Sequence, residues 1–214
     1  MHLRTTTLSA TRLLSLIVIS FLMISCSSSR ELFNGENLEG WETVGNNAGS
    51  WVVTDGILHT QGDGRGWLST TSTYDDFVLD LEYRMPEGGN SGVFIRAPRE
   101  GSPSSQGMEI QILDDYADKH SDLENWQYTG SIYFIQGPSK QVTKPAGEWQ
   151  TMQIVADGPQ IQISLNGEQV VDTNLEDHMD KVEDVPGITR EGGYIGLQNY
   201  NVRVDFRNIR IREL

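Results

Sequence analysis

Two short segments carry polar side chains that could together bind and act on a sugar. Residues 89–96 and 108–115 both alternate apolar and polar residues, so each predicts a strand with one face in a core. The opposite faces carry Phe94 and Arg96 from the first segment and Glu109 and Gln111 from the second. An aromatic ring, a guanidinium, a carboxylate and an amide on one sheet face would suit a sugar.

The chain as a whole, including these two segments, predicts many strands and few helices. The expected strands are 50–54, 56–61, 66–69, 77–84, 91–96, 107–114, 130–135, 149–157, 160–165, 168–173, 193–198 and 202–212. Asn166-Gly167 predicts a tight hairpin, because a type I′ turn needs positive φ at both central residues. The only helical turn expected is near 175–181. Short strands joined by turns, without helices between them, predict an antiparallel sandwich or barrel.

Residues 77–84 indicate how the strands pack. Phe77, Leu79, Leu81 and Tyr83 share one face of this strand and are apolar, while the other face is mostly polar. One core face and one outer face are expected when two sheets stack. We therefore predict an all-β, two-sheet antiparallel jelly-roll sandwich. Residues 115–129 and 175–191 do not fit strands, and loops of this length are often functional lids.

The acidic and histidine residues show no strong metal pattern. Asp114, Asp115 and Asp118 could bind a divalent cation such as calcium through oxygen ligands. His59, His120 and His178 are dispersed without metal-ligand spacing, so we expect no role for them in chemistry. Asp114 has the opposite parity to Glu109 and would join its face only through a bulge.

The N-terminus predicts export and lipid attachment. Residues 1–25 have basic residues followed by a short apolar stretch, which is too short to span a membrane. Cys26, the only cysteine, follows a small residue, as in bacterial lipoprotein signals. We expect a lipidated Cys26 with a short tether over 26–30, and a location in the cell envelope. An ordinary secretory signal is the alternative.

Residues 26–214 are enough for one domain, and their net charge is strongly negative. Without residues 1–25 the chain has 14 basic and 30 acidic residues, a net charge of −16. This charge argues against nucleic acid, whose phosphates require clustered Lys and Arg. It also argues against electrostatic docking on anionic lipid, so membrane attachment is expected through the lipid anchor only. A neutral sugar is compatible with it.

An ordered set of short motifs runs along residues 31–214. They are Leu32-Phe33-Asn34-Gly35, Gly40-Trp41, Gly89-Asn90-Ser91-Gly92, Glu109-Ile110-Gln111-Ile112-Leu113-Asp114, Gly130-Ser131-Ile132-Tyr133, Gly147-Glu148-Trp149, Leu165-Asn166-Gly167, Gly196-Leu197-Gln198 and Phe206-Arg207-Asn208-Ile209. Together they resemble the 3-keto-disaccharide hydrolase domain family. The resemblance implies a single domain over 31–214 with a concanavalin A-like lectin/glucanase fold.

The resemblance also implies a substrate oxidised at C3 of the sugar, and an oxidoreductase partner that makes it. The ketone acidifies the C2 proton, so a base can remove it and the C1 leaving group departs. Such a site needs a base, donors to the ketone oxygen and an acid. The residues assigned to these roles are Glu109 as base, Arg96 and Gln111 as donors, and Tyr133 as acid. Substrate binding is assigned to Asn90, Gln198 and Asn199, with Trp126 or Tyr128 as a stacking platform.

One departure and two alternatives stay open. Many family members have Asp-His after Gly-Leu-Gln, whereas Asn199-Tyr200 stands here. A laminarinase-like glycosidase would use carboxylates at offsets that hold Glu109, Gln111 and Asp114 in this chain. A non-catalytic sugar-binding module would use the same polar and aromatic side chains without cleavage.

Overall fold

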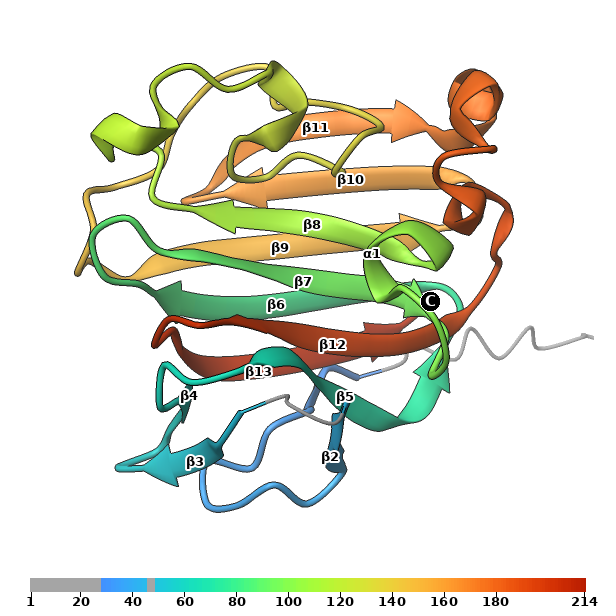
Figure 1. Ribbon diagram of the computed structural model, residues 1–214. Coiled ribbons are helices and arrows are strands. Elements are labelled where there is room, and N and C mark those ends of the chain that lie inside the picture. Colours follow the sequence, from blue (N-terminus) through green and yellow to red (C-terminus); the bar gives the residue numbers. More distant parts are fainter. Residues whose placement is uncertain (1–27, 46–48) are drawn as a thin grey trace, which may run out of the picture.

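Two antiparallel β-sheets stack face to face in the computed structural model, which describes residues 28–45 and 49–214 (Figure 1). The larger sheet has eight strands in the order β11-β10-β9-β6-β13-β4-β3, with β1 paired to β13. Its strands are β1 (Arg30–Glu31), β3 (Trp51–Thr54), β4 (Ile57–Thr60), β6 (Phe77–Arg84), β9 (Gln150–Asp157), β10 (Gln160–Leu165), β11 (Glu168–Asn174) and β13 (Asp205–Glu213). The predicted two-sheet sandwich is confirmed.

The smaller sheet has five strands in the order β2-β5-β12-β7-β8. They are β2 (Trp41–Val44), β5 (Arg65–Tyr74), β12 (Gly193–Tyr200), β7 (Asn90–Ala97) and β8 (Met108–Leu113). Helical segments are short and lie in the connections: α1 (Pro103–Gln106), η1 (Asp118–His120), η2 (Asn125–Gln127), η3 (Leu175–Lys181) and η4 (Pro186–Thr189). In the described residues no helix is long and apolar enough to cross a membrane.

The core lies between the two sheets and comes from the alternation seen in the sequence. Leu79 of β6 and Ile154 of β9 meet Ile110 and Ile112 of β8 in one buried cluster, all four with no exposed surface. Burying a side chain of this size contributes about 2 kcal/mol. The strand predicted at 77–84 is confirmed, with Phe77, Leu79, Leu81 and Tyr83 facing inward. The Asn166-Gly167 hairpin is also confirmed, with φ of 50° and 84°.

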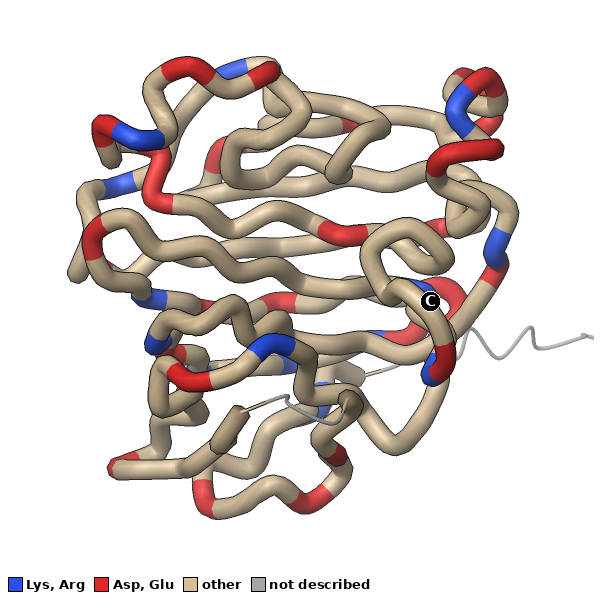
Figure 2. Tube along the Cα trace, viewed as in Figure 1, with Lys and Arg blue, Asp and Glu red and all other residues tan. Residues whose placement is uncertain are grey.

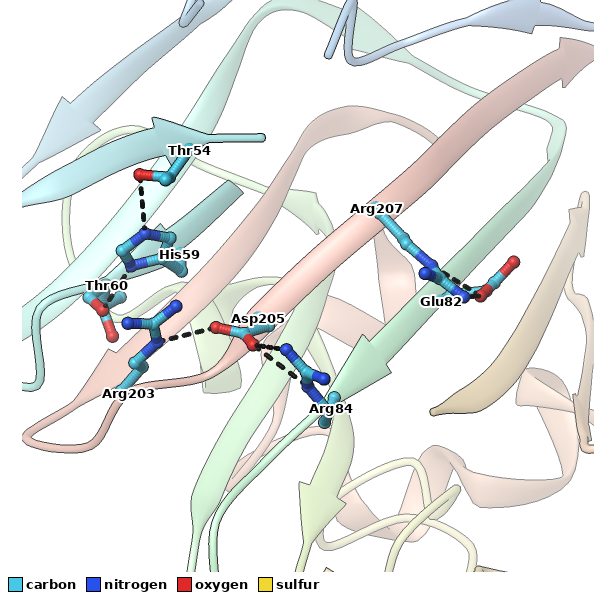
Figure 3. A network of polar contacts seen from close by, with 8 residues as sticks. All are labelled: Thr54, His59, Thr60, Glu82, Arg84, Arg203, Asp205 and Arg207. Carbon is cyan, nitrogen blue, oxygen red and sulfur yellow. Dashed lines mark hydrogen bonds and ion pairs between the residues drawn. The ribbon is translucent and has the colours of Figure 1, made fainter. Parts of the chain in front are cut away.

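The outer face of the larger sheet is polar and held by ion pairs (Figure 3). Asp205 accepts hydrogen bonds from Arg84 at 2.6 Å and from Arg203 at 2.8 Å. Glu82 accepts from Arg207 at 2.7 Å in a separate pair on the same face. Because these carboxylates are already paired with arginines, we assign them a structural role and no role in chemistry.

Residues 130–135 do not form the strand that the sequence predicts. Only Ile132 bridges Ile110 of β8, and Tyr133 N donates to the Glu109 carbonyl at 2.9 Å. The segment then turns, because Phe134 has a φ of 65° and Ile132 N bonds the Gln136 carbonyl at 2.9 Å. It therefore extends the smaller sheet beside β8 for a few residues only.

The N-terminal predictions fall largely outside the described residues. The predicted signal over residues 1–25 and the lipidated Cys26 lie outside the residues that the structure describes. Arg30 already pairs with Ile211 of β13, so the ordered sheet begins one residue before the expected domain start. The strands β1 and β2 were not predicted, because their short sequences lack clear alternation.

Candidate functional site

Glu109 projects from the outer face of the smaller sheet. Met108, Ile110 and Ile112 of β8 point into the core with no exposed surface, so Glu109 and Gln111 must point the other way. On β7, Phe94 is the direct register partner of Glu109, and Asn90 shares the parity of Phe94. Neighbouring strands therefore bring the predicted residues Asn90, Glu109 and Gln111 to one face.

The Glu109 carboxylate is nearly buried, with 6% of the residue exposed. Gln198 of β12 donates from Nε2 to Glu109 Oε1 at 2.8 Å, reaching across β7. Burial raises the pKa of Glu109 to about 7, although the Gln198 hydrogen bond acts in the opposite direction. A carboxyl group with this pKa can take up or release a proton near neutral pH.

Two glycines make the face possible. A Cβ on Gly92 would lie 2.6 Å from Glu109 Oε1, so the glutamate side chain occupies the space over β7 that a larger residue would fill. A Cβ on Gly196 would lie 2.1 Å from a ring carbon of Trp67, so the indole lies over β12 in the same way. Glycine within a strand often marks such a close approach, and this was the available sequence signal.

Three aromatic side chains, Trp126, Tyr133 and Phe134, form an aromatic wall beside β8, where the Tyr133 amide donates to the Glu109 carbonyl at 2.9 Å. The Trp126 ring stacks on Phe134 with centroids 4.2 Å apart, and meets Tyr133 edge-on at 5.0 Å. Phe134 is 49% exposed and has a φ of 65°, a backbone conformation that a bulky residue rarely adopts. The sequence predicted Trp126 and Tyr133 but missed Phe134, because strained backbone leaves no pattern in the sequence.

A cavity of about 480 Å³ lies on the other side, over β5 and β12. Its floor includes Trp67 and Phe94, whose rings meet edge-on at 5.7 Å, and Gln198 lies in its wall. A cleft with an aromatic floor and a few polar groups is the usual form of a small-molecule site. Glu109 thus lies between an aromatic wall and a cavity.

Arg96 is not part of this face, so its predicted place beside Glu109 is wrong. A bulge opposite β12 and a φ of 49° turn Arg96 away from the face of Phe94. Its buried guanidinium donates to the carbonyls of Gly158 at 2.8 Å and Arg190 at 3.1 Å, and to Asp76 Oδ1 at 3.2 Å. Arg96 therefore ties together three connections at one end of the sandwich.

Other predicted residues have structural surroundings of their own. Asn199 lines the cavity over β5 and β12, but it has the opposite parity to Gln198, and its Nδ2 donates to the Asp63 carbonyl. Tyr128 donates from its hydroxyl to the His120 carbonyl at 3.2 Å. Gln111 shares the face of Glu109 but is buried, and its Oε1 accepts from the Ile112 amide at 3.2 Å.

Two residues of the predicted acidic cluster, Asp114 and Asp115, accept hydrogen bonds from the loops around them. Asp114 accepts backbone hydrogen bonds from Gly88 at 2.7 Å and Tyr116 at 3.3 Å. Asp115 accepts from the hydroxyls of Thr129 and Thr143, both at 2.9 Å. Across residues 28–45 and 49–214, no group of three or more His, Cys, Asp or Glu is arranged to hold a metal ion. The calcium site stays a prediction.

Comparison with known proteins identifies the family. A family model described as the 3-keto-alpha-glucoside-1,2-lyase-like domain matches residues 28–212. This chain belongs to that family. The resemblance found in the motifs is thereby confirmed over nearly the whole described chain.

Individual relatives agree with the family and the fold. A 3-keto-disaccharide hydrolase of Bacteroides thetaiotaomicron is 26% identical, over 86% of this chain and 77% of its own. A crystal structure of a candidate glycosyl hydrolase from Parabacteroides distasonis has 30% identity and a TM-score of 0.76, covering 87% of this chain and 100% of its own. The carbohydrate-binding module CBM66 of Bacillus subtilis, 15% identical with a TM-score of 0.55 over 81% of this chain and 96% of its own, shares the fold alone. The family is thus one of carbohydrate-hydrolase type.

Proposed function

We propose that this chain cleaves the glycosidic bond of sugars oxidised at C3, with Glu109 as the general base. The supporting observation is the Glu109 carboxylate on the outer face of the smaller sheet, which is buried and has a pKa of about 7. A base with a pKa near the working pH is both ionised in part and strong enough to take a proton from carbon.

The proposed reaction proceeds by elimination. Ionised Glu109 removes the C2 proton of the 3-keto sugar, the C1–O bond breaks, and the leaving oxygen takes a proton. Water then adds across the C1–C2 double bond to give the free keto sugar. Tyr133, whose backbone lies opposite Glu109, is the proposed acid for the leaving oxygen. The Nε2 group of Gln111 is the proposed donor to the ketone oxygen.

A two-carboxylate glycosidase mechanism receives less support. Such enzymes place two carboxylates on either side of the glycosidic bond. Asp114 stands at the offset of the second acid, but its carboxylate accepts hydrogen bonds from the Gly88 and Tyr116 amides. The 5% exposed Asp114 is thus committed to its loop, and Glu109 is left as the one candidate.

The deciding experiment is product analysis with a 3-keto-glucoside and with the same glucoside unoxidised. Cleavage of the first alone supports the proposal, and cleavage of the second supports a glycosidase. Binding of either without cleavage supports a sugar-binding module. Glu109→Gln should remove turnover while the circular dichroism spectrum stays unchanged, and full turnover by this variant would contradict the role of Glu109.

Two further proposals concern the location of the protein, which rests on the N-terminal sequence, and the supply of its substrate, which rests on the proposed reaction. We propose that Cys26 carries a lipid that anchors the domain in the cell envelope, with Cys26→Ala releasing it to the soluble fraction. A sugar dehydrogenase that oxidises C3 must supply the substrate. Unoxidised disaccharide should therefore be cleaved only when such an enzyme is added.

A further inference from the structure

The cavity over β5 and β12 differs in charge from the rest of the molecule. Its wall includes Arg65 and Arg99 and contains no Asp or Glu. A second cavity of about 470 Å³ at the end of the sandwich is lined by four acidic residues, Asp75, Asp76, Glu176 and Glu191, and by two arginines, Arg96 and Arg190. Acidic positions also outnumber basic ones over the whole fold (Figure 2). A cavity with only positive charge is therefore unusual in this protein.

The two arginines are held differently. Arg99 forms an ion pair with Glu42 and donates to the Thr70 carbonyl at 3.0 Å, so its charge is already engaged. The Arg65 guanidinium lies 4.2 Å over the ring of Tyr200. Among the ion pairs of residues 28–45 and 49–214, none includes Arg65. Arg65 is exposed, and its Nε donates to the side-chain oxygen of Asn201 at 2.6 Å. The terminal nitrogens of the guanidinium are left for a ligand.

The strand register connects Arg65 to Glu109. Arg65 is the register partner of Tyr200, and two residues along each strand Trp67 is the partner of Gln198. Gln198 in turn binds Glu109 at 2.8 Å. The aromatic wall lies beside β8, where the Tyr133 amide donates to the Glu109 carbonyl, and none of its three rings lines this cavity. A keto ring bound at the aromatic wall would leave the rest of the substrate over β12 and β5, on the side of Arg65.

We propose that this cavity binds an anionic leaving group, whose carboxylate is held by Arg65. The inference rests on the proposed function, since it places the keto ring at Glu109. A planar guanidinium held over an aromatic ring presents two N–H groups to a carboxylate at once. Because Arg65 is exposed, the attraction must weaken as salt screens it.

The test compares two aryl 3-keto-glucosides of similar size, with charged 4-carboxyphenyl and neutral 4-carbamoylphenyl leaving groups; comparing their ratio between two enzymes cancels their different leaving abilities. The ratio of their kcat/KM values should be about tenfold higher in the wild type than in Arg65→Gln, and this difference should shrink at high salt. Arg212→Gln is the matched control, because Arg212 lies in β13 of the other sheet and has no ion pair among the described residues.

The outcomes separate the two proposals. If the neutral substrate is cleaved but the ratio is the same in the wild type and Arg65→Gln, the anionic subsite is wrong and the proposed function stands. If neither substrate is cleaved, the proposed function fails, and equilibrium binding of the two unoxidised glucosides tests Arg65. About tenfold weaker binding of the carboxylate alone by Arg65→Gln then supports the subsite, and equal binding overturns it.

Discussion

Replacing Glu109 by Gln should stabilise the fold at alkaline pH. Burial raises the pKa of Glu109 from 4.5 to about 7, even though Gln198 opposes the shift. Folding therefore favours the protonated form, and the wild type loses stability as the pH rises from about 4.5 to about 7. At about 1.4 kcal/mol per pH unit this loss is about 3 kcal/mol. Gln has no proton to lose and still offers an oxygen to the Gln198 amide.

The assay is urea unfolding of both proteins at pH 4 and pH 8. The free energies of unfolding should agree at pH 4, where Glu109 is protonated in both states. At pH 8 the variant should be more stable by up to about 3 kcal/mol. Glu148→Gln is the matched control, because Glu148 is exposed and forms no ion pair among the described residues. It should change nothing at either pH.

A difference in the free energy of unfolding that does not depend on pH would contradict a raised pKa of Glu109 in the folded protein. So would a variant that is less stable than the wild type at pH 8. Either result would mean that the folded protein does not disfavour the ionised carboxylate, so burial would not adjust Glu109 for its proposed role as a base. The expected result would instead show that the protein gives up stability to keep this carboxylate on the face.

Four further outcomes test the surroundings of the site. Gly92→Ala should lower kcat at least about tenfold with little change in melting temperature, because the added Cβ displaces the Glu109 carboxylate. Gln198→Met should move the acidic limb of the kcat/KM profile to higher pH by about one unit, since it removes the hydrogen bond that lowers the pKa of Glu109. Arg96→Met should reduce the free energy of unfolding by about 3 kcal/mol without moving that limb, as measured by urea titration. Burial opposes ionisation of Asp205, but its two arginine partners outweigh burial and lower its pKa. Asp205→Asn should therefore be less stable than the wild type at pH 7. As the pH falls below about 4, the wild type should lose more stability than this variant, because its Asp205 becomes protonated.

The strand pattern determined the fold and much of the face. Alternation over 77–84 and 108–113 predicted which residues enter the core, because each strand exposes alternate side chains to opposite faces. The same rule placed Glu109 and Gln111 together and excluded Asp114 from their face. Turn chemistry predicted the Asn166-Gly167 hairpin. These features are local, so a single sequence can specify them.

Features that depend on contacts between segments far apart in the chain could not be predicted from the sequence. Arg96 left the expected face through a bulge with positive φ, and arginine gives no local signal for that conformation. Gln198 was expected to bind substrate, but it also holds Glu109 from a strand 89 residues away. Strand alternation in the sequence was enough to predict that one carboxylate lies on a sheet face compatible with a sugar. The packing of β12, β7 and the 126–134 segment around it decided that this carboxylate is buried, and burial is what brings its pKa to about 7.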